Sequence, residues 1–495
     1  MSTAWVIAVF SVYFSLLIVI AVVGARRMRN MSEYVLGGRR LSSFTAALSA
    51  GSSTTSAWTM LALPALAYVS GLVEMWIPLA AAVGLWLSWT FVARRLRRYT
   101  IAANDVLTIP EFFEVRFGDT TGILRGMTAA ITILFVVFYV SSGLVGGSKL
   151  LDTMFGIETN TGILLTFGAV ASYTLIGGFL AVSRTDVFQA LLMITSLTII
   201  ATVLISSTGS PFADTTGENQ GFFNPFTSST GSSIDAVFIL SALGWAFGAF
   251  GAQRILQRFM AIEREDHIPR SRNLSFVWLV LVYSLALIVG LVAHSALTES
   301  AMLGEVTDPE RIYVVVSEVF FHPAVTGLLL TAVIAAVMST ADSQLLLASA
   351  VATDDMPVLK RIAYAISENR RVWLGRLLLV IIGGVGVLVS VYFPGSINEL
   401  VAYAWGGMGA AFGPVTILAL FWRRFNFPGA LASIVVGTVV ASIWAFSDGG
   451  PSGMWDMQPA TPGFILASVV AVVVTLATPP PSREVVHLFD RVNAR

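Results

Sequence analysis

The chain has 495 residues, of which 56% are hydrophobic and 12% are charged, and its formal net charge is zero. Soluble domains carry about 25% charged residues, so this composition excludes an ordinary soluble protein. The balanced charge gives no sign of a nucleic-acid partner, and the absence of cysteine excludes disulfides, thiol catalysis and thiolate metal sites.

Apolar segments long enough to cross a hydrocarbon core of about 30 Å recur along the whole chain. They predict an all-α polytopic membrane protein with thirteen spans, in which residues 1–495 form a single transmembrane domain. The first span has no Lys or Arg before it and the basic sequence ARRMRN after it, which predicts a retained helix with its N-terminus outside. The predicted spans are residues 4–24, 44–67, 72–93, 123–148, 162–182, 187–207, 234–251, 275–296, 323–351, 373–393, 398–421, 427–446 and 462–478.

The distribution of basic residues tests this topology. It places 27 of the 29 Lys and Arg residues in predicted cytoplasmic segments, and leaves only Lys149 and Arg311 outside. Because Lys and Arg favour cytoplasmic loops, this bias predicts thirteen spans and an internal C-terminus. The inner segments 94–122 and 352–372 are expected to hold short amphipathic helices at the membrane surface. No loop is long enough for an enzyme domain, so we expect the function to lie within the bilayer.

The second span contains the sequence ALSAGSSTTSAW (residues 47–58), a run of small and hydroxyl residues. Irregular backbone in a membrane survives only where it is buried in protein or lines a cavity, and secondary transporters break one helix in each half of an inverted repeat. Span seven has a matching Gly-interrupted stretch, SALGWAFGAFGA (residues 241–252), five spans later and in the opposite direction. Close packing would explain either stretch alone. The pairing favours two inverted repeats, residues 44–207 and 234–421, with extra helices at 4–24 and 427–478.

Span nine carries polar residues in the sequence AAVMSTADSQLL (residues 335–346), where Ser339, Asp342 and Ser343 share one helix face. A carboxylate in a span costs about 2.5–3.5 kcal/mol on insertion scales, so Asp342 requires a reason. It could lie near the cytoplasmic end, but a small hard cation bound by hydroxyls, carbonyls and a carboxylate is the better explanation. Asp186 could serve such a site or could simply cap span six.

Other classes of function find less support. A sensor would need a cytoplasmic signalling domain, and the tail after span thirteen is short; a channel is not excluded by the sequence. An enzyme is not expected, because the histidines are scattered without a metal-binding spacing. The segment GGMGAAFG (residues 406–413) is interpreted as small-residue packing through Gly409 and Gly413. The four histidines are His267, His294, His322 and His487.

Five segments resemble the sodium:solute symporter family, most closely its Na+/proline branch: YVLGGRRLSSFTAALSAGSSTTSAW, LTIPEFFEVRFGD, TLIGGFLAVSRTDVFQA, AAVMSTADSQLL and VAYAWGGMGAAFGPV. The resemblance covers nearly the whole chain. It implies a LeuT-like fold of two inverted five-helix repeats, spans 2–6 and 7–11, in a multi-pass protein of the cell membrane. It also implies coupled entry of Na+ and a small organic solute. The sequence gives no sign of an obligate protein partner, and none is expected.

The resemblance also implies a set of site residues. The main Na+ site would use the carbonyls of Ser52, Thr55 and Ala336 and the side chains of Ser339 and Thr340. A possible second Na+ site would use Asp186, Ser339, Asp342 and Ser343. The solute site would be lined by Ser53, Thr54, Ser56, Trp58, Tyr139 and Trp245.

Two departures from the proline carriers concern the site itself. In those carriers the segment that corresponds to residues 50–58 resembles AGASDMSGW, with an aspartate where this chain has Thr54 and a methionine where it has Thr55. They also have a tyrosine in place of Ala249. We expect Asp342 to supply the missing negative charge, in which case Asp342→Asn should raise the Na+ concentration needed for half-maximal uptake. L-Proline is the expected solute, and the alternatives are another amino acid, a monocarboxylate, pantothenate or a sugar. H+ or Li+ could replace Na+.

Overall fold

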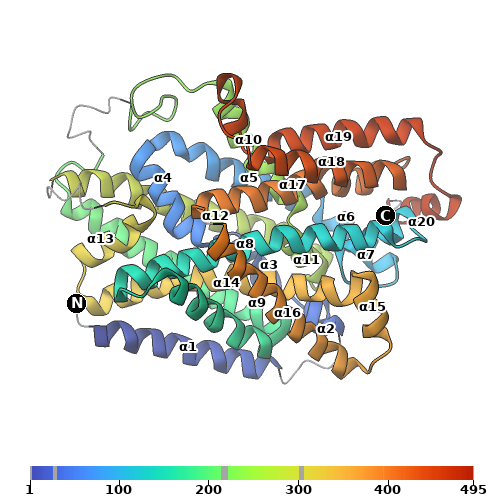
Figure 1. Cartoon of the computed structure of the whole chain (residues 1–495), viewed down its shortest axis with the longest axis horizontal. Coiled ribbons are helices and arrows are strands. Elements are labelled where there is room, and N and C mark those ends of the chain that lie inside the picture. The colour runs from blue at the N-terminus through green and yellow to red at the C-terminus, as the bar shows by residue number, and fades with distance from the viewer. Residues whose placement is uncertain (1–2, 26–30, 213–220, 300–305, 394, 494–495) are drawn as a thin grey trace.

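The computed structural model describes residues 3–25, 31–212, 221–299, 306–393 and 395–493, and within these ranges the fold is built from helices (Figure 1). Residues 26–30, with three of the basic residues predicted to be cytoplasmic, lie outside this description. So do residues 213–220, between predicted spans six and seven, and residues 300–305, between predicted spans eight and nine. The helices in the first half of the chain are α1 Thr3–Ala25, α2 Met31–Leu36, α3 Ser43–Ser52, α4 Leu63–Ser70, α5 Trp76–Phe91, α6 Ala93–Ala102, α7 Ile109–Phe117, α8 Ile123–Phe155, α9 Thr159–Ser207 and α10 Ala236–Gly251. Those in the second half are α11 Gln253–Ala261, α12 Ile268–Glu299, α13 Ile312–Phe320, α14 Pro323–Asp355, α15 Pro357–Tyr364, α16 Glu368–Tyr392, α17 Ile397–Phe421, α18 Phe427–Ala445, α19 Ala460–Ala477 and α20 Arg483–Asn493.

Ten of the described helices are long and apolar enough to cross a membrane, or eleven if the bent pair α10 and α11 is one span. The predicted count of thirteen differs for two reasons. Predicted span two is divided into short pieces, α3 and α4, neither of which is long enough to cross a membrane alone. Predicted spans five and six are continuous in α9, which contains one non-helical residue, Gly178, with φ 62° and ψ −177°. That conformation is open almost only to glycine, and it turns the chain within α9.

Both predicted helix breaks are confirmed. Helix α3 ends at Ser52, four irregular residues follow, and the chain resumes as a π-helical turn over Trp58–Ala62 that leads into α4. Helix α10 ends at Gly251, Ala252 is extended with ψ 98°, and α11 leaves at an angle of 43°. The two irregular segments thus fall where the sequence predicts them, one in each half of the chain.

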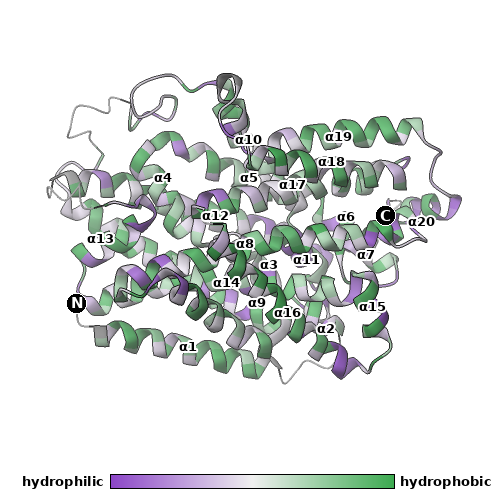
Figure 2. Cartoon of the chain, viewed as in Figure 1, coloured by the Kyte–Doolittle hydropathy of each residue, from purple (hydrophilic) through white to green (hydrophobic). Residues whose placement is uncertain are grey.

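The burial pattern places α14 at the centre of the bundle, because every residue from Leu329 to Asp355 is buried. In contrast, α1, α18 and α19 are apolar on all sides and expose large hydrophobic side chains, as the green ribbons of Figure 2 show. Apolar surface of this extent is expected on a lipid-facing helix. The exposed hydrophobic residues of these three helices include Ile7, Val12, Val19, Val439, Ile443, Val473 and Leu476.

The short helices at one end of the molecule only partly match expectation. The predicted inner segments do contain helices, α7 and α15, and α15 exposes Val358 and Ile362 as a surface helix would. Helix α7 begins at the cap residue Thr108, whose hydroxyl accepts the N–H of Glu111, but it packs into the protein and most of its residues are buried. The two chain ends lie at opposite ends of the molecule (Figure 1).

One expectation about basic residues is wrong. Arg254 and Arg258 are counted above among the cytoplasmic residues that follow span seven. In the structure span seven continues beyond Gly251 into α11, in which all nine residues are buried, and both guanidinium groups lie inside the bundle. The chain bends at Ala252, directly after Gly251, and does not leave the bundle there.

Candidate functional site

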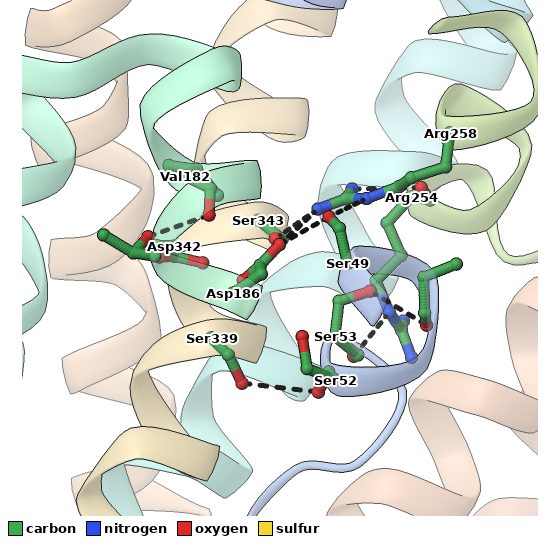
Figure 3. A network of polar contacts seen from close by, with 12 residues as sticks. Ser49, Ser52, Ser53, Val182, Asp186, Arg254, Arg258, Ser339, Asp342 and Ser343 are labelled. Atoms are coloured by element: carbon green, nitrogen blue, oxygen red, sulfur yellow. Dashed lines mark hydrogen bonds and ion pairs between the residues drawn. The ribbon is translucent and has the colours of Figure 1, made fainter. Parts of the chain in front are cut away.

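The five residues of the predicted main Na+ site lie together where the break between α3 and α4 meets α14. The Ser339 hydroxyl donates to the Ser52 carbonyl at 3.3 Å or to the Ala336 carbonyl at 3.1 Å, so it bridges the two elements (Figure 3). The Thr340 hydroxyl reaches the Ser53 carbonyl at 3.2 Å, and the Thr55 hydroxyl reaches the Ser52 carbonyl at 3.1 Å. All of these side chains are buried. The site is therefore a cluster of neutral oxygen atoms, which is the ligand type that hard cations prefer.

The local sequence explains why the helix opens here. Ser and Thr side chains compete with the backbone N–H groups for the helical carbonyls. The Ser53 and Thr54 hydroxyls both donate to the Ala50 carbonyl, at 3.3 and 2.7 Å. Gly51 adds a packing requirement, because a Cβ atom there would lie 2.4 Å from the Trp278 ring. The carbonyl of Ser53 then points away from the helix and accepts side-chain donors from α14 and α11.

An arginine side chain, that of Arg258, occupies the predicted second Na+ site. Arg258 of α11 donates through Nη2 to Asp186 at 3.2 Å and to the Ser343 hydroxyl at 2.6 Å (Figure 3). The Ser49 hydroxyl donates to the same Asp186 oxygen at 2.6 Å and accepts from Arg258 Nε at 3.1 Å. Both charged side chains are completely buried. The pair brings together α3, α9, α11 and α14, and it explains how two ionised groups persist in an apolar bundle.

The structure tests the simpler explanations that the sequence allowed for these two carboxylates. Asp186 is not a helix cap, because it lies inside α9, eight residues after the break at Gly178. Asp342 lies inside α14, away from both helix ends, and is fully buried. Its carboxylate accepts a hydrogen bond from the Tyr173 hydroxyl. In Figure 3, Asp342 lies beyond Asp186, on the side away from Arg258 and the broken helix. The two carboxylates are thus neighbours, and Asp342 does not join the main-site cluster through any of its hydrogen bonds.

Four of the six predicted solute residues form two pairs. Ser53 and Tyr139 are joined by Arg254, whose Nε donates to the Ser53 carbonyl at 3.0 Å and whose Nη2 donates to the Tyr139 hydroxyl at 3.2 Å. Trp58 and Trp245 pack against each other, with ring centroids 4.7 Å apart. The remaining two hydroxyls bond locally: Thr54 to the Ala50 carbonyl, and Ser56 to the N–H of Trp58. All six predicted residues are buried.

Helix α17 covers the aromatic pair. Trp58 Nε1 donates to the Asn398 side chain at 2.8 Å, and Trp405 Nε1 donates to the Trp245 carbonyl at 2.8 Å. Glu310 accepts the N–H groups of Ile397 and Asn398 at the start of α17, each at 3.2 Å. Asn398 and Trp405 of α17 therefore bind both members of the tryptophan pair.

The sequence prediction does not include Arg254 and Arg258 in the site, because predicted span seven ends at Gly251. One signal was available: QRILQRFMA places its two arginines four residues apart among apolar residues, a spacing that puts both on one face of a buried helix. The prediction also missed Ser49, Tyr173 and Trp405, for which the sequence carries no distinguishing signal.

Comparison with solved structures identifies the fold. A Na+-coupled sialic acid symporter in a substrate-bound, outward-open state matches with a TM-score of 0.80 at 19% identity, over 97% of this chain and 99% of that one. Mhp1, a transporter of the nucleobase-cation-symport-1 family, matches with a TM-score of 0.57 at 14% identity, over 92% and 98%. The architecture is therefore that of LeuT-like transporters, as the family resemblance implies.

Curated relatives match along nearly the whole length. The sodium/proline symporter of Haemophilus influenzae is 36% identical over 97% of this chain and 96% of its own. The high-affinity proline transporter of Bacillus subtilis is 37% identical over 94% and 96%. The sodium/proline symporter of Escherichia coli is 35% identical over 98% and 95%.

These relatives are membrane transporters, which confirms the expectation of a multi-pass membrane transporter rather than an enzyme. The model of the sodium:solute symporter family matches residues 34–437, which include both broken helices and all of α14. The chain belongs to the sodium:solute symporter family.

Proposed function

We propose that this protein couples the entry of Na+ to the uptake of a small organic solute, and that the solute is L-proline. The observation that carries the proposal is the Ser339 hydroxyl, which lies between a carbonyl of the broken helix and a carbonyl of α14. A cation bound there would hold the two elements together. Relatives at 35–37% identity that are named as proline transporters support the choice of solute.

The main Na+ site would consist of the Ser52, Thr55 and Ala336 carbonyls with the Ser339 and Thr340 hydroxyls. The donor set suits Na+, because it offers neutral oxygens from two elements without a carboxylate. The Ser52 hydroxyl supports this assignment, because it is buried in the same cluster and has no hydrogen-bond partner among the described residues.

We propose one Na+ per transport cycle. The second site would need Asp186 and Ser343, which are bridged by Arg258, and Asp342, which accepts from Tyr173. These contacts favour the arginine as the resident cation at that position. A Hill coefficient near one for Na+ is the expected result, and a value approaching two would restore the second site.

We propose that the protein crosses the membrane thirteen times, with its N-terminus outside and its C-terminus inside. The break at Gly178 supports counting α9 as two crossings, and the break after Ser52 supports counting α3 and α4 as one. The chain ends at opposite ends of the molecule support an odd number of crossings (Figure 1). Residues 44–207 and 234–421 would then form the two inverted repeats, with extra helices at 4–24 and 427–478.

Alternating access follows from this arrangement. Na+ would join the α3–α4 break to α14 and shape the solute site beside it, and the bound solute would favour closure of α17 over Trp58 and Trp245. One Na+ with a net-neutral zwitterion moves one charge, which provides about 2.3 kcal/mol per 100 mV. That corresponds to roughly 40-fold accumulation before the Na+ gradient is counted.

Uptake of radiolabelled L-proline into proteoliposomes tests the proposal directly. An inward Na+ gradient should drive accumulation, and replacement of Na+ by K+ should abolish it. Accumulation driven equally well by a proton gradient would contradict Na+ coupling. If proline is not taken up while Na+ still raises the thermal stability of the purified protein, the solute assignment is wrong and the other solute classes should be screened.

A further inference from the structure

Arg254 has an unusual environment for a buried arginine. Its side chain is completely buried at the start of α11, directly after the bend in span seven. Its hydrogen bonds go to neutral groups, the Ser53 carbonyl and the Tyr139 hydroxyl, and its guanidinium carbon lies 4.4 Å from the Tyr139 ring centroid and 5.3 Å from that of Trp405. Nη1 has no hydrogen-bond partner among the residues that the structure describes.

Comparison with Arg258, one helical turn later, shows that Arg254 lacks a carboxylate partner in the described part of the chain. Arg258 is paired with the carboxylate of Asp186, whereas Arg254 forms no ion pair with any described residue. Burying a charge is costly unless an opposite charge and hydrogen bonds compensate it. A carbonyl, a phenol and two aromatic faces offset only part of that cost. The positive charge of the Arg254 guanidinium is therefore not balanced by a negative charge on any described residue in contact with it. Figure 3 shows this group beside the broken helix rather than beside Asp186.

The location of Arg254 indicates where that anion would come from. Both of its hydrogen-bond partners belong to the predicted solute site, and the six residues predicted to line that site are all uncharged. Thr54 contributes a hydroxyl where the proline carriers have an aspartate. The solute site of this chain consequently carries one positive charge and no negative one.

We propose that Arg254 binds the carboxylate of the transported solute and that the site selects small organic carboxylates, with or without an amine. This inference rests on the proposed function, because it takes the residues around Ser53 and Tyr139 to be the solute site. The remaining hydrogen of Nη2 and those of Nη1 would donate to the two carboxylate oxygens, the geometry in which arginine binds carboxylates best. Because no acidic side chain lines the site, an ammonium group on the solute is not required for binding.

Two matched pairs of small molecules test the proposal on the unmodified protein. The first pair is L-proline and L-prolinamide, and the second is cyclopentanecarboxylate and cyclopentanecarboxamide, which keep the ring and lack the amine. Binding is measured on purified full-length protein in Na+ by competition and by thermal stabilisation, and repeated in K+. We expect both acids to bind in Na+ and both amides to bind at least about 10-fold more weakly.

Three variants test the residue. Arg254→Gln should weaken the binding of both acids by about 10- to 100-fold and leave the amides unchanged, and Arg254→Lys should recover part of the affinity. Arg116→Gln is the matched control, because Arg116 is also completely buried and donates to backbone carbonyls, those of Ala419 and Trp422, but lies outside the site. It should keep the preference for acids over amides. Stabilisation of each variant by Na+ alone reports that it is folded.

Each outcome decides a different question. Equal binding of acids and amides, or unchanged acid binding in a folded Arg254→Gln protein, would overturn the role of Arg254 while leaving Na+-coupled transport intact. Binding of cyclopentanecarboxylate without L-proline would overturn proline as the solute and support the carboxylate site. If Na+ stabilises the protein but neither acid binds, the carboxylate proposal and the proline assignment both fall.

Discussion

The Ser339 hydroxyl is uncharged, yet it is the side chain that bridges the broken helix and α14. If it is also a Na+ ligand, Ser339→Ala should raise the Na+ concentration for half-maximal proline uptake by about 10-fold or more, because an interaction with a charged group is worth about 1.5–3 kcal/mol. The maximal rate at saturating Na+ should change much less. The measurement is initial uptake rate against Na+ concentration in proteoliposomes.

Thr331→Ala provides the control for this experiment. Thr331 is buried on the same helix two turns earlier, and its hydroxyl donates only to the Gly327 carbonyl of α14 itself. Its replacement should leave the Na+ dependence unchanged. An unchanged Na+ dependence in Ser339→Ala as well would place the coupling ion elsewhere.

The expectation for Asp342 changes with the structure. The sequence suggested that its carboxylate compensates for the missing aspartate at position 54, but its hydrogen bond goes to Tyr173. We therefore expect Asp342→Asn to leave the Na+ concentration for half-maximal uptake within about twofold of the original, because its direct contact is not with the proposed main site. A tenfold increase in that concentration would instead support the compensating role.

The pair of Arg258 and Asp186 makes a prediction about stability. Removing one partner leaves a buried uncompensated charge, so Arg258→Gln and Asp186→Asn should each destabilise the protein by about 3–5 kcal/mol. The double variant should be more stable than either single one, because no charge is left unpaired. Thermal unfolding of the purified proteins in detergent gives the comparison, and additive losses in the double variant would argue against a direct interaction. Asp266→Asn, in the exposed pair with Arg264, should change the midpoint little.

At the scale of elements, helix α9 depends on one glycine. Gly178 has φ 62° and ψ −177°, a conformation that costs a side chain about 1–3 kcal/mol. Gly178→Ala should therefore lower the yield of folded protein and its thermal midpoint. Gly168→Ala is the control on the same helix, because a Cβ atom there would meet nothing within 4 Å and alanine favours helix. Equal midpoints for the two variants would mean that the turn at Gly178 is tolerant of a side chain.

The helix breaks could be predicted because their cause is local. Hydroxyl residues that bond to nearby carbonyls and glycines that admit a close neighbour are both visible in the sequence. The packing role of Gly409 was predictable for the same reason, and a Cβ atom there would lie 2.8 Å from Gly248 on α10. The length of span seven was not predictable in this way, because glycine is also common directly after the end of a helix, so the glycines before the bend could equally mark a helix end.

The site was predictable only where the family resemblance supplied positions. The contact of Ser52 with Ser339 joins residues 287 positions apart, and the bridge from Arg258 to Asp186 joins residues 72 apart. Periodicity and composition carry no information on such pairings, which arise when α3, α9, α11 and α14 pack together. Because placing an arginine in a membrane span costs free energy, such a residue stands out in a sequence, but its partner is determined by the tertiary structure.

At the scale of the whole molecule, the distribution of polar groups is the reverse of that in a soluble protein. Five of the six residues from Ser339 to Gln344, near the middle of α14, are polar and buried, while α1, α18 and α19 present apolar side chains to the surroundings. In lipid, apolar surface costs nothing, so polar residues are retained only where partners satisfy them. The buried oxygens and arginines between α3, α11 and α14 consequently lie beside the irregular backbone that follows α3 and the bend between α10 and α11.

The proposed topology can be tested because the chain has no cysteine of its own. If α9 turns back at Gly178, its start and the segment after its end lie on the same side of the membrane; if α9 crosses once, they lie on opposite sides. We expect the Asn160→Cys and Ser232→Cys variants, both at exposed positions, to react with an impermeant maleimide added outside right-side-out vesicles. Ser367→Cys, at an exposed position in a predicted inner segment, should react only after the membrane is permeabilised. Labelling of only one of the first two variants would reduce the number of crossings and remove the inverted-repeat assignment, because spans two and seven would then enter the membrane in the same direction.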